Sequence, residues 1–118
     1  PRNCGVDRNE RGGYCNAPKN PKIARAALHR WEEPCISGTN GSGTVFFSGC
    51  NLKCVYCQNF KISRQGFGKE VSVVRLSEIF LELQQQGAHN INLVSPTPYI
   101  PRIIEAIDLV RDKMKIPF

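Results

Sequence analysis

Apolar positions recur along this chain with two different periods. Between Ser72 and Gly87 they fall three and four residues apart, which predicts an amphipathic helix with Ser72 as its N-cap. The stripe consists of Val73, Leu76, Ile79, Phe80 and Leu83. A second helical stripe follows Pro101 and consists of Ile103, Ile107, Val110 and Met114. Short runs at residues 44–47 and 90–94 have the length and residue types of buried strands.

The order of strand, helix, strand and helix predicts an α/β fold with parallel strands. We expect residues 44–118 to form the first βα units of an incomplete parallel barrel, because two units cannot close one. Residues 60–71 are expected to be irregular. The chain begins at Pro1 rather than at an initiator methionine, and residues 116–118 resemble the opening of a further strand. We therefore expect a fragment of a longer protein.

Residues 1–43 are predicted to form a separate segment ahead of the barrel. Its first 20 residues are rich in Gly, Pro, Asn and Arg and contain Cys4 and Cys15, which predicts an irregular structure. A helix is expected to begin with Asn20 as cap and to end at Pro34. Its apolar face would hold Ile23, Ala26, Ala27 and Trp31. A Gly- and Ser-rich lead-in follows this helix.

Three cysteines come directly after the first predicted strand of the barrel. Cys50, Cys54 and Cys57 are spaced by four and then three residues, and three thiolates at such spacing suit an iron–sulfur cluster with one iron left open. Cys54 and Cys57 are too close in sequence for a useful disulfide. Zinc usually takes four ligands in two separated pairs, and buried cysteine also serves as a small apolar residue. The cluster is the favoured interpretation, with zinc as its main rival.

Charge and composition indicate which partners the protein could bind and in which compartment it is expected. The net charge of the 118 residues is +6, and residues 1–30 hold seven Lys or Arg against two acidic residues. Such a basic arm suits nucleic acid or an acidic protein, although a solvated surface is the favoured interpretation. No apolar run approaches the roughly 18 residues of a membrane span, and no signal peptide is evident. Reduced thiols that hold iron indicate the cytoplasm.

Residues 48–59, SGCNLKCVYCQN, resemble the cluster loop of radical S-adenosylmethionine enzymes, which has an aromatic residue before its last cysteine. They are most similar to the glycyl-radical activating branch, and the surrounding sequence is similar to proteins related to the pyruvate formate-lyase activating enzyme. The resemblance covers nearly the whole chain. It implies that Cys50, Cys54 and Cys57 hold a [4Fe-4S] cluster whose open iron chelates S-adenosylmethionine.

The same resemblance implies a reaction and its partners. One electron, from reduced flavodoxin or ferredoxin, would cleave the sulfonium and yield a 5′-deoxyadenosyl radical. In the activating branch this radical takes a hydrogen atom from a backbone glycine of a glycyl-radical enzyme. A radical enzyme acting on RNA or a small molecule, and a non-catalytic iron–sulfur or zinc module, stay open as alternatives.

Other residues have expected roles beside the cluster. Tyr56 would cover the adenine of S-adenosylmethionine or exclude water, while Leu52 and Val55 would pack the loop onto its strand. Many relatives carry a Gly-Gly-Glu motif at the end of the second strand, where this chain has residues 95–99, SPTPY. Here the resemblance is weaker, and Pro98 stands where some relatives have histidine. Ser95 and Thr97 either bind the amino or ribose groups of the cofactor or simply cap the turn.

The remaining cysteines give a weaker signal. Cys4 and Cys15 lie among turn-forming residues, and Cys35 follows Pro34. Cys4 and Cys15 suggest a small second metal site, whose other ligands would be Cys35 or residues from further upstream in the parent protein. Free surface thiols, or pieces of a truncated module, are interpretations of equal weight.

Overall fold

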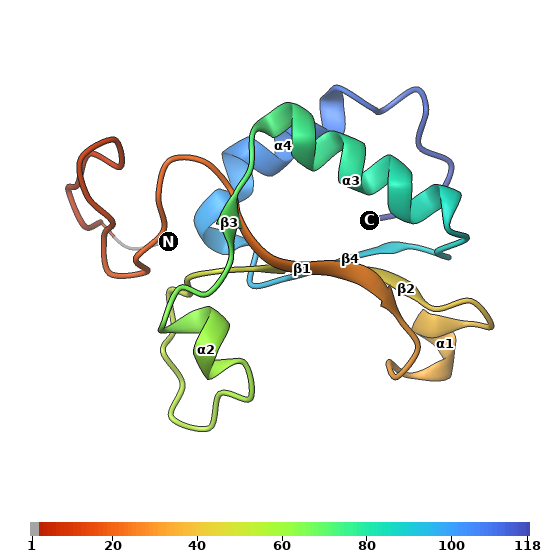
Figure 1. The fold of residues 1–118 in the computed structure, drawn as a ribbon, viewed down its shortest axis with the longest axis horizontal. Coiled ribbons are helices and arrows are strands. Elements are labelled where there is room, and N and C mark those ends of the chain that lie inside the picture. Colours follow the sequence, from red (N-terminus) through yellow and green to blue (C-terminus); the bar gives the residue numbers. More distant parts are fainter. Residues whose placement is uncertain (1–2) are drawn as a thin grey trace.

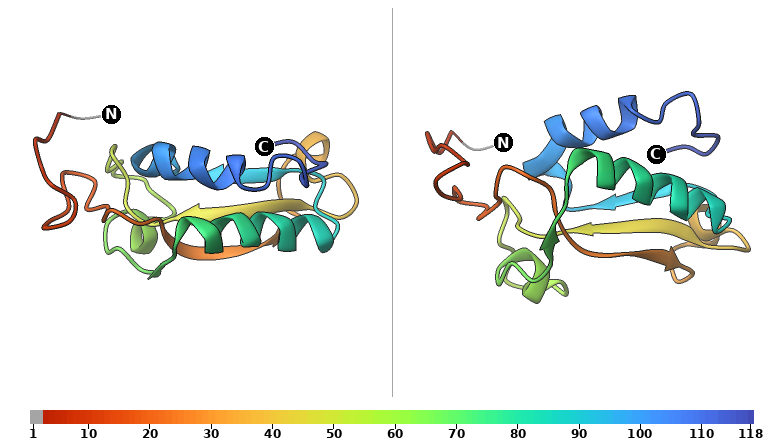
Figure 2. Two further views of the ribbon diagram at one scale, coloured as in Figure 1. Left: turned by 90° about the horizontal axis from the view of Figure 1, so that it is seen from above. Right: turned by 45° about the horizontal axis from the view of Figure 1, so that its top comes forward.

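A four-stranded sheet with two helices on one face forms the framework of the computed structural model, which describes residues 3–118. The strands lie in the order β3-β1-β2-β4. The central strand β2 (Ser42–Phe47) is parallel to β4 (Ile91–Val94), and the register pairs Gly43 with Ile91 and Phe46 with Val94. Helix α3 (Val73–Gln85) connects these strands, and α4 (Ile100–Asp108) follows β4 on the same face (Figures 1 and 2). The α/β class and the parallel pairing are therefore confirmed.

The helix expected between Asn20 and Pro34 is wrong, because this segment forms strand β1 (Lys22–His29). β1 runs antiparallel to β2, with Ile23 opposite Phe47 and His29 opposite Ser42, so the sheet is mixed rather than wholly parallel. The spacing of Ile23, Ala26 and Ala27 matches a helical face, but helix propensity is a weak preference that tertiary context overrides. The buried strand β2 needs hydrogen-bonding partners along both of its edges, and β1 supplies one of them.

Two further segments differ from expectation. Pro34 does not end a helix but begins the short helix α1 (Pro34–Ser37), where its missing N–H costs nothing. Residues 60–71 are not wholly irregular: they contain helix α2 (Phe60–Ser63) and strand β3 (Lys69–Glu70). β3 pairs antiparallel with the beginning of β1.

Helix α3 has the ends that its sequence predicts. The Ser72 side chain accepts a hydrogen bond from the Arg75 N–H at 3.0 Å, and Gly87 adopts a φ of 88° just beyond the helix. The predicted stripe faces the sheet, and Leu76, Phe80 and Leu83 are almost fully buried. A single turn of 3-10 helix, η1 (Thr97–Tyr99), leads into α4.

The longest helix of the described residues is α3, with 13 residues. Within residues 3–118, no helix combines the length and the apolar character that a membrane crossing requires.

Candidate functional site

The three cysteines of the predicted site lie on the loop that joins β2 to α2. Cys50 follows the last residue of β2 by three positions, and Cys57 precedes α2 by three. All three are free thiols; Cys54 is exposed, and Cys50 and Cys57 are half-buried. The sequence therefore places the trio at the carboxyl end of a central strand, where α/β proteins commonly bind ligands.

The loop begins with a backbone position that only glycine fits well. Gly49 has a φ of 86°, and a Cβ atom there would lie 2.7 Å from the backbone oxygen of Cys15. Its N–H donates to the Ile62 carbonyl at 3.0 Å. The preceding carbonyl, that of Ser48, accepts a buried hydrogen bond of 2.9 Å from the Tyr99 hydroxyl. The start of the loop is thus fixed from three directions.

Further along, Arg64 holds the middle of the loop. Its guanidinium donates to the carbonyl oxygens of Lys53 and Cys54 and lies 5.5 Å from the centre of the Phe60 ring. Lys53 adopts a φ of 59°, which is uncommon for a residue with a side chain. These contacts turn the chain between the first and second cysteine.

Two of the thiols have polar neighbours. The Leu52 N–H donates to Cys50 Sγ at 3.5 Å, and Cys57 Sγ lies 3.2 Å from Ser63 Oγ. Hydrogen bonds to sulfur stabilise a thiolate and tune a bound cluster.

The donor set fits an iron–sulfur cluster by its chemistry. It offers three thiols on one short loop, none of them in a disulfide, and such clusters are held by cysteine thiolates. Among the described residues, no three His, Cys, Asp or Glu side chains are already gathered as a metal site. Convergence of the three sulfurs would accompany cluster binding, as metal binding commonly orders its ligands.

Ser95 and Thr97 lie at the same edge of the sheet as the cysteine loop. Because β2 and β4 are parallel and Phe46 pairs with Val94, the residues that follow both strands emerge side by side. Ser95 is half-buried and adopts a φ of 58°, while Thr97 is exposed at the start of η1. The structure thus brings these two predicted cofactor ligands to the edge that carries the cysteines.

The apolar side chains of the loop are exposed. Tyr56 is 94% exposed, so its ring is free to meet a ligand. Leu52 and Val55 are 64% and 83% exposed, and the expectation that they pack the loop onto β2 is wrong. Gly49, at the start of the loop, is the residue that is buried, and it packs against the backbone of Cys15.

The N-terminal segment contributes contacts that the sequence did not indicate. The Arg8 guanidinium donates to the carbonyl oxygen of Pro98 and lies 3.9 Å from Cys15 Sγ. The ammonium of Lys53 lies 4.1 Å from the centre of the Tyr14 ring, a cation–π contact. Arg8 and Pro98 are 90 positions apart, and Tyr14 and Lys53 are 39 apart, so no local pattern reveals these two contacts.

A pocket of about 460 Å³ lies between this segment and the cysteine loop. The residues around it include Cys4, Cys15 and, from the loop, Asn51. Cys35 lies on α1, at the opposite end of the sheet from the N-terminal segment (Figure 1). A second metal site shared by Cys4, Cys15 and Cys35 is therefore not supported.

Comparison with known proteins identifies the family. Residues 44–118 match the model of the radical SAM superfamily. An uncharacterized protein of Methanocaldococcus jannaschii is 30% identical over 113 residues, which cover 88% of this chain and 32% of that protein. The chain thus spans about a third of the length of this curated relative. No solved structure matches. Because the family model covers more than half of the sequence, the chain belongs to the radical SAM superfamily.

Proposed function

We propose that Cys50, Cys54 and Cys57 hold a [4Fe-4S] cluster and that the parent protein reductively cleaves S-adenosylmethionine. The observation that carries this proposal is the trio of free thiols on the loop after β2, inside the region that matches the family. When bound, the cluster supplies the electron that cleaves the sulfonium, and the radical chemistry is that of the cofactors.

The residues of this chain bind and position these groups. Cys50, Cys54 and Cys57 act as thiolates, which the positive charge of iron favours. Gly49 and Arg64 set the path of the loop that carries them, through the contacts with Cys15 and with the loop carbonyls.

Three residues are proposed as contacts of S-adenosylmethionine. Ser95 and Thr97 would donate or accept hydrogen bonds at its amino or ribose groups, from the strand end beside the loop. The exposed ring of Tyr56 would cover the adenine and exclude water. Pro98 is buried and cannot replace a histidine side chain in this role.

We propose activation of a glycyl-radical enzyme as the reaction of the parent protein, in the manner of the pyruvate formate-lyase activating enzyme. Its substrate would be a backbone glycine of that enzyme, and reduced flavodoxin or ferredoxin would supply the electron. A reducing compartment, the cytoplasm, is the proposed location because the thiols must stay reduced.

An RNA substrate is the second candidate. It is favoured by the structure in one respect: the basic N-terminal segment lies beside the cysteine loop rather than apart from it. Binding of RNA that weakens steeply with salt would distinguish this candidate from a protein substrate.

The test is anaerobic reconstitution of the parent protein with iron and sulfide. We expect a brown protein with about four irons, whose electron paramagnetic resonance signal changes when S-adenosylmethionine is added. Replacing Cys50, Cys54 or Cys57 by Ala should abolish the cluster. Cys4→Ala and Cys35→Ala are the matched controls and should retain it. Full iron content and an unchanged signal in Cys54→Ala would overturn the proposal.

A further inference from the structure

The end of helix α2 contacts the cysteine loop at three places. The Ile62 carbonyl accepts a hydrogen bond of 3.0 Å from the Gly49 N–H, at the start of the loop. The Arg64 guanidinium, just after the helix, donates to two backbone carbonyls in the middle of the loop. Between these two residues, Ser63 Oγ lies 3.2 Å from Cys57 Sγ, at the end of the loop. Three consecutive residues thus hold the beginning, the middle and the end of the segment that carries the thiols.

Ser63 is the residue of this group whose side chain reaches a sulfur. It is 5% exposed, and its backbone N–H already donates to the Asn59 carbonyl at 2.8 Å. Among the described residues, the partner found for its hydroxyl is the sulfur of Cys57. A buried hydroxyl that lacks a partner is unfavourable. The hydroxyl is therefore expected to stay at this sulfur.

The direction of this hydrogen bond follows from the state of the thiol. In the protein without a cluster, either atom can be the donor. A cysteine thiolate that binds iron has no proton to give, so the serine hydroxyl must then donate to the sulfur. A hydrogen bond to a charged acceptor is about twice as strong as one between neutral groups.

The sulfur of Cys50 has a different kind of neighbour. It accepts a hydrogen bond of 3.5 Å from the Leu52 N–H, within the exposed loop. Electrostatic interactions are weaker in such a solvated place than in a buried one. The contribution of the buried Ser63 hydroxyl should therefore be the larger of the two.

We propose that Ser63 is a positioning residue for Cys57, and that its hydroxyl raises the reduction potential of the bound cluster. The inference rests on the proposed function, because it concerns the cluster that the three loop cysteines would hold. Reduction by one electron adds negative charge to the cluster and its sulfur ligands, and no bond forms or breaks. A donated hydrogen bond stabilises the more negative state. The raised potential lets a weaker one-electron reductant supply the electron that cleavage of S-adenosylmethionine consumes.

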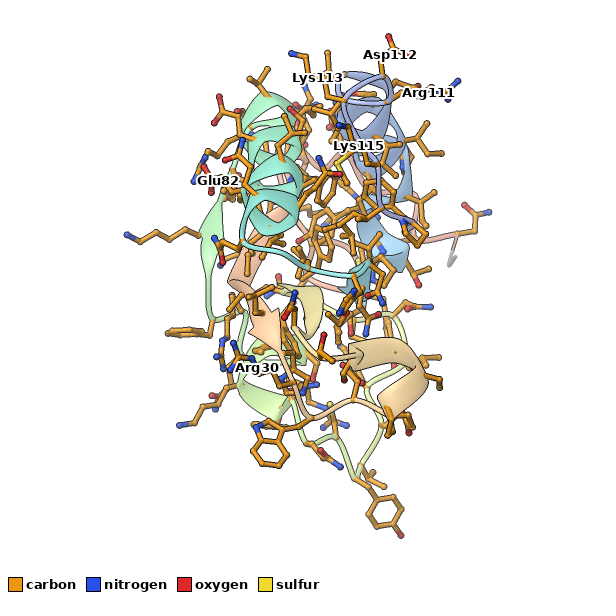
Figure 3. All side chains as sticks on the ribbon, turned by 90° about the vertical axis from the view of Figure 1, so that its right-hand side faces the viewer. Arg30, Glu82, Arg111, Asp112, Lys113 and Lys115 are labelled. Carbon is orange, nitrogen blue, oxygen red and sulfur yellow. The ribbon has the colours of Figure 1, made fainter. Side chains whose placement is uncertain are left out.

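The experiment compares Ser63→Ala with Ser77→Ala in the reconstituted parent protein. Each change removes the hydroxyl of a buried helical serine, and that of Ser77 donates to the Val74 carbonyl at 2.7 Å. Ser77 lies on α3, above the sheet in Figure 1, whereas α2 lies below the sheet. Figure 3 shows α3 from the side, with Glu82 labelled on it. Ser77→Ala is therefore the matched control, because it makes the same chemical change away from the thiols.

The reduction potential is measured by anaerobic titration with dithionite and redox mediators, and the electron paramagnetic resonance signal reports the reduced cluster. At a fixed solution potential, Ser63→Ala should lower the ratio of reduced to oxidised cluster by about 3- to 10-fold, because a charge-assisted hydrogen bond is lost. A tenfold change corresponds to about 59 mV for a one-electron couple. Ser77→Ala should leave the potential unchanged. Ser63→Thr keeps the hydroxyl and should have a potential close to that of wild type.

A second measurement detects the hydrogen bond itself. Electron nuclear double resonance of the reduced protein, before and after exchange into D₂O, reports exchangeable protons close to the cluster. Ser63→Ala should lack one such proton signal that wild type and Ser77→Ala retain.

A wild-type potential in Ser63→Ala would overturn the proposal, and so would an equal shift in Ser77→Ala. If Ser63→Ala loses its iron with an unchanged unfolding midpoint while Ser63→Thr keeps the cluster, the hydroxyl is needed to position Cys57, which supports the proposal. Loss of iron in both Ser63 variants would overturn it. Failure of the wild-type protein to assemble a cluster would count against the proposed function instead.

Discussion

The helix-covered face of the sheet and the cysteine loop contain the same kinds of residue, but they differ in how far the apolar side chains are buried and in whether the cations have acidic partners. On the helical side, Phe80 is fully buried and meets the Phe118 ring at 5.0 Å, and the arginines are paired with acids. On the loop, Tyr56 and Val55 are exposed and the cations lack acidic partners among the described residues. Buried apolar groups stabilise the fold, whereas apolar groups left in water contribute little to it. The exposed residues of the loop therefore contribute little to the stability of the fold, and their composition is typical of a binding surface.

The largest effect is expected when an aromatic residue of the helix-covered face is replaced, and it is compared with the replacement of an aromatic residue of the cysteine loop. Phe80→Ala should lower the free energy of unfolding by about 3–5 kcal/mol, because it leaves a cavity between α3 and the sheet. Tyr56→Ala should change it by no more than about 0.5 kcal/mol, since the ring is exposed. Urea unfolding of both variants measures the contrast. Similar losses in the two would show that the loop is packed in solution, contrary to its exposure here.

A smaller effect is expected where the two regions meet, at Gly49. Gly49→Ala should cost about 2–4 kcal/mol, because a left-handed φ strains alanine and the added carbon meets the Cys15 carbonyl at 2.7 Å. Gly5→Ala is the matched control. Gly5 has a φ of 59° but no atom within 4 Å of the added carbon, so it should cost only about 1–2 kcal/mol.

The two glycine variants separate strain from contact. If urea unfolding gave the same loss for both, the close approach of the N-terminal segment to the loop would be wrong. A larger loss for Gly49→Ala would confirm that this segment holds the start of the loop.

The same division explains what the sequence could predict. Helix α3 is marked by neighbours in sequence, from the Ser72 cap to the period of its stripe, and it was predicted correctly. The position of the three cysteines at the end of a strand could also be predicted, because they directly follow the strand in the sequence. Strand β1 was missed because its apolar spacing fits a helix, and only its pairing with β2 decides between the two. The contact of Arg8 with Pro98 joins residues 90 positions apart, and no pattern in the sequence of either segment predicts it.

The smallest predicted loss is at Tyr99, whose hydroxyl links η1 to the loop. Tyr99→Phe removes the donor to the buried Ser48 carbonyl and should cost about 1–2 kcal/mol near neutral pH. The ring itself is kept, so its packing 5.7 Å from the Phe47 ring centre should persist. Urea unfolding of wild type and variant gives this difference. A loss below about 0.3 kcal/mol would mean that the carbonyl finds another partner.

The pH dependence of the stability difference between wild type and Tyr99→Phe tests whether the Tyr99 hydroxyl is buried. Burial raises the pKa of Tyr99 above its ordinary value, while tyrosine in the unfolded chain titrates near about 10. Below that pH both states keep the proton and the stabilisation is complete. Above it the unfolded state loses the proton first, so the contribution of Tyr99 falls by up to about 1.4 kcal/mol per pH unit. The advantage of wild type over Tyr99→Phe should therefore shrink between about pH 9 and pH 11. A difference that stays constant over this range would show that the hydroxyl is in contact with water, and that the loop is not tied to η1 in the way the structure describes.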